Sequence, residues 1–175
     1  SNALMQEIAL HAKECIAFGE IGLDFKALTT SEEKELQVSI FKKFIALGKE
    51  LKKPLIVHAR GSRGEVLRIL QEEKAESVLL HSFIAKEKQL KQLLELPFFI
   101  SVGAGVLNYE WIQSFAKELL LEKMLLETDS PLTFGGEQCT PARIPKIAQK
   151  IAELKGIGLK KVEEKTSENF QKLFS

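Results

Sequence analysis

The chain has 175 residues, of which 45% are hydrophobic and 28% are charged, and its formal net charge is +1. This composition is typical of a globular protein and excludes a disordered chain, and no apolar run approaches the roughly 20 residues that cross a bilayer. The near-neutral charge gives no general electrostatic case for nucleic-acid binding, which would need a local patch or a bound metal. Two cysteines, Cys15 and Cys139, form no disulfide framework and no CxxC metal motif. A cytoplasmic location is the default expectation.

The first three residues are expected to be a vector-derived tag, and residues 4–175 are expected to form a single domain. Short apolar runs alternate along this domain with longer helix-periodic segments. This pattern is typical of repeated β-α units around a buried parallel sheet. The expected strands are residues 15–19, 55–58, 77–81, 98–102 and 124–128, with Cys15 inside the first. The expected helices are residues 31–52, capped by Ser31, and 64–73, 86–94, 109–120, 144–155 and 167–174. The predicted fold class is α/β.

Ionisable side chains fall at the C-terminal ends of four of these strands: Glu20, His58, His81 and Asp129. In a parallel α/β barrel these ends converge on the face where such folds place catalysis. Two imidazoles and two carboxylates suit Zn²⁺, Mn²⁺, Fe or Co, whereas Mg²⁺ would gain little from histidine. A lone histidine at a strand end is more often a hydrogen-bonding residue than a ligand, so the four-residue pattern carries the metal interpretation. Metal-dependent hydrolysis is the chemistry that such a site predicts.

Five further residues have a structural interpretation that competes with, or replaces, a functional one. Arg60 suits a phosphate or a loop-stabilising salt bridge equally well, whereas Asp24 favours a turn or N-cap role over metal binding. Glu127 should share the face of the strand-end carboxylate, or it could pair with a cation inside the barrel. Phe83 could stack on a base, but buried packing is more common, and His11 is expected to be a solvated surface residue.

Five segments together resemble the TatD-like deoxyribonuclease family of metal-dependent hydrolases. They are GEIGLDF at residues 19–25, PLIVHAR at 54–60, HSF at 81–83, LETDSP at 126–131 and TSENFQKLF at 166–174. The resemblance implies a TIM-type (β/α) barrel, one or two divalent metal ions per chain, and DNA as the substrate, with no membrane partner. By resemblance, Glu20 bridges two ions, His58 and His81 bind one of them, and Asp129 binds the other and orients the attacking water. Glu20 and Asp129 are then the catalytic residues, and Arg60 is the candidate for substrate binding.

The resemblance also implies that the barrel is incomplete. Family members carry an HxH pair on a first strand and two further strands before the GEIGLD segment, so five of eight strands are expected here. Five parallel strands leave two open edges, for which self-association into a homo-oligomer is the expected solution. Three functions therefore stay open: a TatD-like DNase, a catalytically impaired scaffold or interaction module, and a metal hydrolase of small amides or esters.

Overall fold

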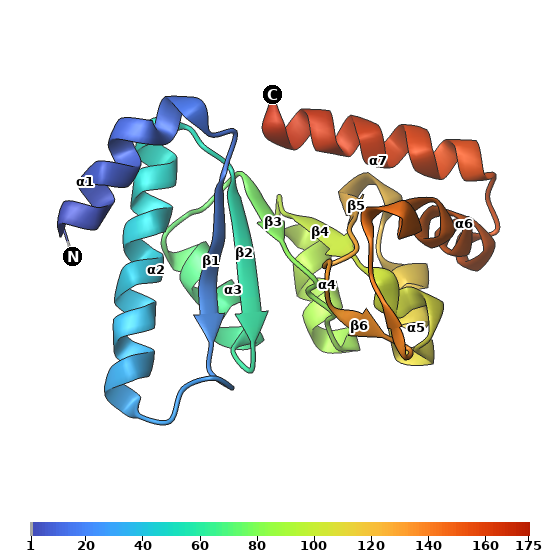
Figure 1. Cartoon of the computed structure of the whole chain (residues 1–175), viewed down its shortest axis with the longest axis horizontal. Coiled ribbons are helices and arrows are strands. Elements are labelled where there is room, and N and C mark those ends of the chain that lie inside the picture. The colour runs from blue at the N-terminus through green and yellow to red at the C-terminus, as the bar shows by residue number, and fades with distance from the viewer. Residues whose placement is uncertain (1) are drawn as a thin grey trace. The chain divides into compact units, whose positions relative to one another are not determined.

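The computed structural model describes residues 2–175, with side chains described for residues 5–86 and 89–175, so Ser1 of the expected tag lies outside the described residues. The chain divides into two compact units, which meet in sequence between Leu79 and Leu80. We call them the N-terminal unit and the C-terminal unit. Figure 1 labels the α-helices and most of the strands of the two units.

The N-terminal unit consists of two parallel strands and the helices that cover them. Its elements are α1 (Asn2–His11), η1 (Ala12–Glu14), β1 (Phe18–Asp24), α2 (Ser31–Leu51), β2 (Leu55–Arg60) and α3 (Arg63–Glu72). The long helix α2 packs on β1 and contributes Phe41 and Ile45 to the core, where both are almost fully buried. The helix begins with a capping box in which the Thr30 side chain accepts from Glu33 N and the Glu33 side chain accepts from Thr30 N.

The C-terminal unit begins inside β3 and carries the remaining elements. They are β3 (Val78–Leu80), α4 (Glu87–Glu95), β4 (Phe99–Val102), η2 (Ala104–Leu107), α5 (Glu110–Glu118), η3 (Leu121–Lys123), β5 (Met124–Leu126), β6 (Thr133–Phe134), β7 (Glu137–Gln138), η4 (Pro141–Arg143), α6 (Ile144–Lys155) and α7 (Leu159–Phe174). All four residues of β4 are buried, as expected for a strand of a parallel sheet. Strands β4 and β5 pair in parallel, and β6 and β7 form a separate antiparallel ribbon.

The five main strands follow one another in a single sheet in the order β1-β2-β3-β4-β5. This succession of parallel strands and helices confirms the predicted α/β class and the five β-α repeats of a TIM-type barrel. Among the described residues, no helix combines the length and the apolar character of a membrane span.

The first predicted strand is wrong in its position. Strand β1 starts at Phe18 and runs to Asp24, and Cys15 lies before it as an exposed residue. The apolar run around Ile16 misled the prediction, because that side chain is 63% exposed. An irregularity in the pairing between Phe18 and Ile21 also disturbs the alternation of buried and exposed residues on which strand prediction depends. Glu20 therefore lies inside the strand, not after its end.

Three smaller differences concern helix ends and the ribbon. Thr30, not Ser31, caps α2, because it is the residue that keeps an extended backbone. Helix α7 begins at Leu159, well before the predicted start, and buries Val162 and Thr166 in its first half. The β6–β7 ribbon was not predicted, since two strands of two residues are too short to show an alternating pattern.

Candidate metal centre

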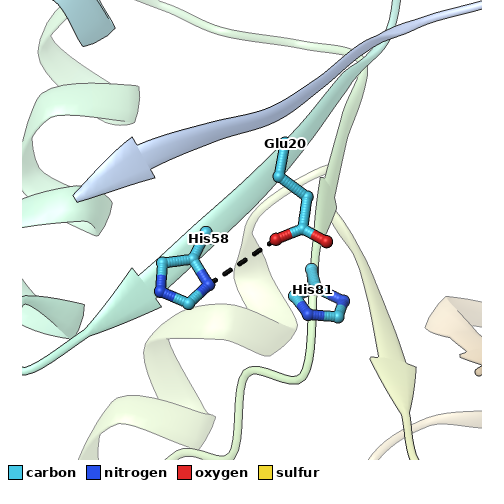
Figure 2. A group of neighbouring side chains, drawn as sticks. All are labelled: Glu20, His58 and His81. Carbon is cyan, nitrogen blue, oxygen red and sulfur yellow. Dashed lines mark ion pairs between the residues drawn. The ribbon is translucent and has the colours of Figure 1, made fainter. Parts of the chain in front are cut away.

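Glu20 and His58 lie next to one another on the paired strands β1 and β2. Glu20 Oε2 is 3.7 Å from His58 Nδ1, and Figure 2 marks this ion pair with a dashed line. The Glu20 side chain is 50% exposed and that of His58 is 34% exposed. Both side chains are therefore partly open to solvent.

Gly22 allows the close approach of the strands at this point. It pairs with His58 in the parallel register, and its φ of +135° lies in a region that residues with a side chain rarely adopt. A Cβ on Gly22 would lie 2.1 Å from the carbonyl oxygen of His58, which is far inside contact distance. The second glycine of the GEIG segment is thus needed to hold His58 beside β1.

Asp24 has two roles, one on each carboxylate oxygen. Its Oδ1 accepts hydrogen bonds from the backbone amides of Lys26 and Ala27 at 3.1 and 3.2 Å, which confirms the predicted turn role. Its Oδ2 lies 3.7 Å from His58 Nε2 and 3.6 Å from Arg60 Nη1. The turn prediction did not include this second contact, which makes Asp24 a neighbour of a predicted ligand.

Arg60 is the last residue of β2. The sequence had indicated instead that it lies in the loop after this strand. Its side chain is 63% exposed, so the ion pair with Asp24 leaves much of the guanidinium accessible. The salt bridge that the structural interpretation predicted is thus present, between Arg60 and Asp24. Phosphate binding by Arg60 stays a prediction. Gln37 of α2 also reaches this area, where its Oε1 accepts from Asp24 N at 3.0 Å. Glu20, Gly22, Asp24, Gln37 and His58 line part of an open pocket of about 290 Å³.

His81 and Glu127 form the tighter pair of the C-terminal unit. His81 follows β3 directly, and its Nδ1 lies 2.8 Å from Glu127 Oε2, with the two side chains only 12% and 15% exposed. A carboxylate can only accept, so Nδ1 carries the hydrogen, and Nε2 is the nitrogen that would bind a metal. That Nε2 is 3.8 Å from Asp129 Oδ2. A histidine whose second nitrogen is held by a carboxylate is the usual arrangement of a metal ligand.

The contact resolves the open role of Glu127, which pairs with a histidine. Its backbone nitrogen donates to Val102 O at 3.2 Å and so anchors it to β4. Its Oε1 is buried and has no hydrogen-bond partner among the described residues. Buried carboxylate oxygens are rarely left without a donor or a cation, so this orphaned oxygen and the nearby histidine fit a bound divalent ion or its water.

The backbone around Asp129 is constrained. Asp129 has a φ of 56° and Ser82, directly after His81, has a φ of 44°, both in the left-handed region that is uncommon outside glycine. Ser82 N donates to the buried Ser101 Oγ at 3.1 Å. Two turns that follow strands thus adopt costly conformations beside predicted ligands, as functional sites often do.

The closing TSENFQKLF segment is structural. Asn169, 5% exposed, donates to the carbonyl oxygens of Leu121 and Met124, each at 2.8 Å, and so ties α7 to the start of β5. Thr166 Oγ1 donates to Val162 O in the same helix at 2.9 Å.

The structural roles predicted for Phe83 and His11 are confirmed. Phe83 is fully buried and packs in the core, and His11 is an exposed residue that lies near Glu14.

Comparison with known proteins identifies the family. The model of the family described as TatD related DNase matches residues 2–175. The chain is 36% identical over 167 residues to the uncharacterized metal-dependent hydrolase YcfH of Escherichia coli K12, covering 91% of this chain and 62% of YcfH. It is 36% identical over 163 residues to human deoxyribonuclease TATDN3, covering 91% of this chain and 60% of that protein.

The fold has the same relatives. The crystal structure of the TatD homologue YJJV from Escherichia coli superposes with a TM-score of 0.88 at 22% identity, covering 99% of this chain and 71% of YJJV. The chain therefore spans about three-fifths to seven-tenths of the length of these proteins. The chain belongs to the TatD-related DNase family.

Proposed function

We propose that this chain carries the metal-dependent hydrolase site of a TatD-like DNase and cleaves phosphodiester bonds in DNA. The ligands would be Glu20, His58, His81 and Asp129, with Arg60 contacting phosphate. The observation that carries the proposal is His81, whose Nδ1 is held by Glu127 at 2.8 Å while Nε2 faces Asp129. A histidine fixed in this way is ready to bind a metal before any ion arrives.

The family supports the choice of these ligands, because its model matches residues 2–175 and so includes all four of them. His58 lies in the second half of β2, and His81 follows the last residue of β3. Nitrogen and carboxylate donors in equal number suit Zn²⁺, Mn²⁺, Fe or Co better than Mg²⁺.

Each residue has a defined task in the proposed reaction. A bound divalent ion supplies Lewis acidity toward a phosphoryl oxygen and lowers the pKa of water. Asp129 accepts a hydrogen bond from the attacking water and takes up its proton. The exposed guanidinium of Arg60 binds a non-bridging phosphate oxygen, and Asp24 keeps that guanidinium near His58.

DNA as the substrate comes from the relatives. The human relative is named a deoxyribonuclease, and the family model has the same description. A net charge of +1 does not favour DNA over other substrates. The ligand set is therefore the argument for hydrolysis, and the family is the argument for DNA as the substrate.

The proposal is tested by hydrolysis assays on metal-loaded protein with three substrates: an oligonucleotide, bis(p-nitrophenyl) phosphate, and a small amide or ester. His81→Ala is compared with His11→Ala, which removes an exposed histidine outside the site. We expect hydrolysis of both phosphodiesters, at least about tenfold weaker in His81→Ala and unchanged in His11→Ala. Cleavage of the amide or ester alone would favour a different hydrolase. Equal rates for the two variants, or no hydrolysis by metal-loaded protein, would contradict the site.

A further inference from the structure

Two aromatic rings stand in solvent at the start of α5. Tyr109 is the N-cap residue of this helix and is 39% exposed, and Trp111, two residues later, is 59% exposed. Their ring centroids are 6.4 Å apart and their planes are inclined by 34°. Large aromatic side chains are costly to leave in water, so an exposed pair of this kind marks a binding surface.

The backbone beneath these rings is held firmly. Tyr109 N donates to Gly105 O at 3.0 Å, and Gln113 Nε2 donates to Val106 O at 3.0 Å. A Cβ on Gly105 would lie 2.5 Å from Ile112 Cδ1 and 3.5 Å from Tyr109 Cδ2, so the bare backbone fits under both side chains. The rings are therefore presented by an ordered turn, and little conformational entropy would be lost when a ligand binds them.

Trp111 also forms one wall of a groove of about 590 Å³ between α4 and α5, which Lys86, Leu90, Phe115 and Glu118 line as well. Lys86 is the N-cap residue of α4 and ends the loop that starts with His81. Glu118, the last residue of α5, supplies a negative charge that would repel phosphate from its part of the groove. Among its described residues, the groove thus offers an indole, apolar side chains and the ammonium group of Lys86, which lies on the loop that leaves the proposed metal site.

We propose that Tyr109 and Trp111 are a stacking platform for the bases of single-stranded DNA, with Lys86 contacting the backbone phosphate. The inference rests on the proposed function and names the form of its substrate. Every base has a flat face that stacks on an aromatic ring, so such a platform binds without sequence preference. Bases in a duplex already stack on one another and do not offer these faces, which makes single strands the fitting partner.

The sequence contains one tryptophan, so intrinsic fluorescence reports on Trp111 alone. The protein, kept metal-free with a chelator to prevent cleavage, is titrated with an oligothymidine of about 12 nucleotides. An abasic oligonucleotide of the same length provides the same phosphates without bases. We expect saturable quenching by oligothymidine and little or none by the abasic strand. Equal quenching by the two strands, or none by either, would overturn the platform.

Variants test the platform through the binding of a dye-labelled oligothymidine. Trp111→Ala should weaken binding about 5- to 150-fold, whereas Trp111→Phe keeps a ring and most of the affinity. Lys86→Gln should lower the salt dependence of binding by about one released counterion. Phe170→Ala, which removes a 49% exposed aromatic ring from α7, is the matched control and should bind normally. If Trp111→Ala and Phe170→Ala have the same affinity, the platform is wrong.

Failure of this inference can be told apart from failure of the hydrolase proposal. Hydrolysis of bis(p-nitrophenyl) phosphate involves no base stacking, so the rate of the parent protein with this substrate reports on the hydrolase site alone. If the parent protein hydrolyses phosphodiesters but oligothymidine does not quench Trp111, the platform fails and the hydrolase stands. If quenching depends on bases while no hydrolysis occurs, the platform stands as a binding site and the hydrolase fails.

Discussion

The two units hold their predicted ligands by different means. In the N-terminal unit, Glu20 and His58 are 3.7 Å apart, partly exposed, and placed by the close pairing of β1 and β2 at Gly22. In the C-terminal unit, His81 is nearly buried and oriented by a 2.8 Å hydrogen bond to Glu127. Backbone changes should therefore affect the first pair most, and side-chain changes the second.

Gly22→Ala should have the largest effect on this comparison. The new methyl group would meet the His58 carbonyl at 2.1 Å, at a φ of +135°, so we expect a loss of about 3 kcal/mol or more of unfolding free energy. Urea denaturation measures it. Gly64→Ala is the control, because nothing lies within 4 Å of its Cβ and helix α3 should gain up to about 1 kcal/mol. Equal stability of the two variants would contradict the steric account.

Asn169→Ala tests the C-terminal unit by itself. It removes the side-chain donor from the carbonyl oxygens of Leu121 and Met124, and we expect a loss of about 1–3 kcal/mol in unfolding free energy. Hydrogen exchange should show faster exchange in β5 and α7. The exposed Ser167→Ala in the same helix should change the stability by no more than about 0.5 kcal/mol. A similar small effect of Asn169→Ala would show that the closing motif has another role.

Glu127→Ala sharpens the contrast between the two pairs. Removal of the partner of His81 Nδ1 should weaken metal binding about 10- to 100-fold, as measured by competition with a chromogenic chelator. Glu127→Gln should have a smaller effect, since its amide oxygen can still accept from Nδ1. The exposed Glu95→Ala at the end of α4 controls for the lost charge. Unchanged affinity in Glu127→Ala would mean that His81 is held in another way or is not a ligand.

The smallest effect concerns the cap of α2 in the N-terminal unit. Backbone hydrogen bonds from Thr30 and Thr29 lower the pKa of Glu33 below its ordinary value of 4.5. A carboxyl group with a lowered pKa in the folded state adds stability above its unfolded pKa, and that stability is lost as the pH falls through the folded value. Urea unfolding across this acidic range should therefore show a weaker pH dependence in Glu33→Gln than in the parent. Glu35→Gln, outside the capping box, controls for the lost charge; identical curves for both variants would contradict the assignment.

The sequence predicts the elements well where the apolar pattern is regular. Residues 144–155 form a helix with the predicted bounds, because an amphipathic pattern ends there at Gly156, which adopts the left-handed conformation. Prediction from the sequence fails at β1, where the strand pairing is irregular and Ile16 is exposed. Periodicity describes a regular strand and cannot locate such an irregularity.

Prediction of the site has a similar limit. Strand-end position and family resemblance point to His81 and Asp129, and the structure brings these two side chains to 3.8 Å. The sequence left Glu127 open and gave Asp24 only its turn role, because contacts between strands depend on register. For Glu127, the sequence offered one signal, which is its position two residues before Asp129.

The most direct test of the account is the metal content of the chain after loading and dialysis, measured by elemental analysis for the parent and for Glu20→Ala. The account predicts at least one tightly bound divalent ion per parent chain and a clear loss of metal in Glu20→Ala, because this carboxylate lies beside His58. A parent chain that binds no metal, or a Glu20→Ala variant that binds as much as the parent, would contradict the proposed centre.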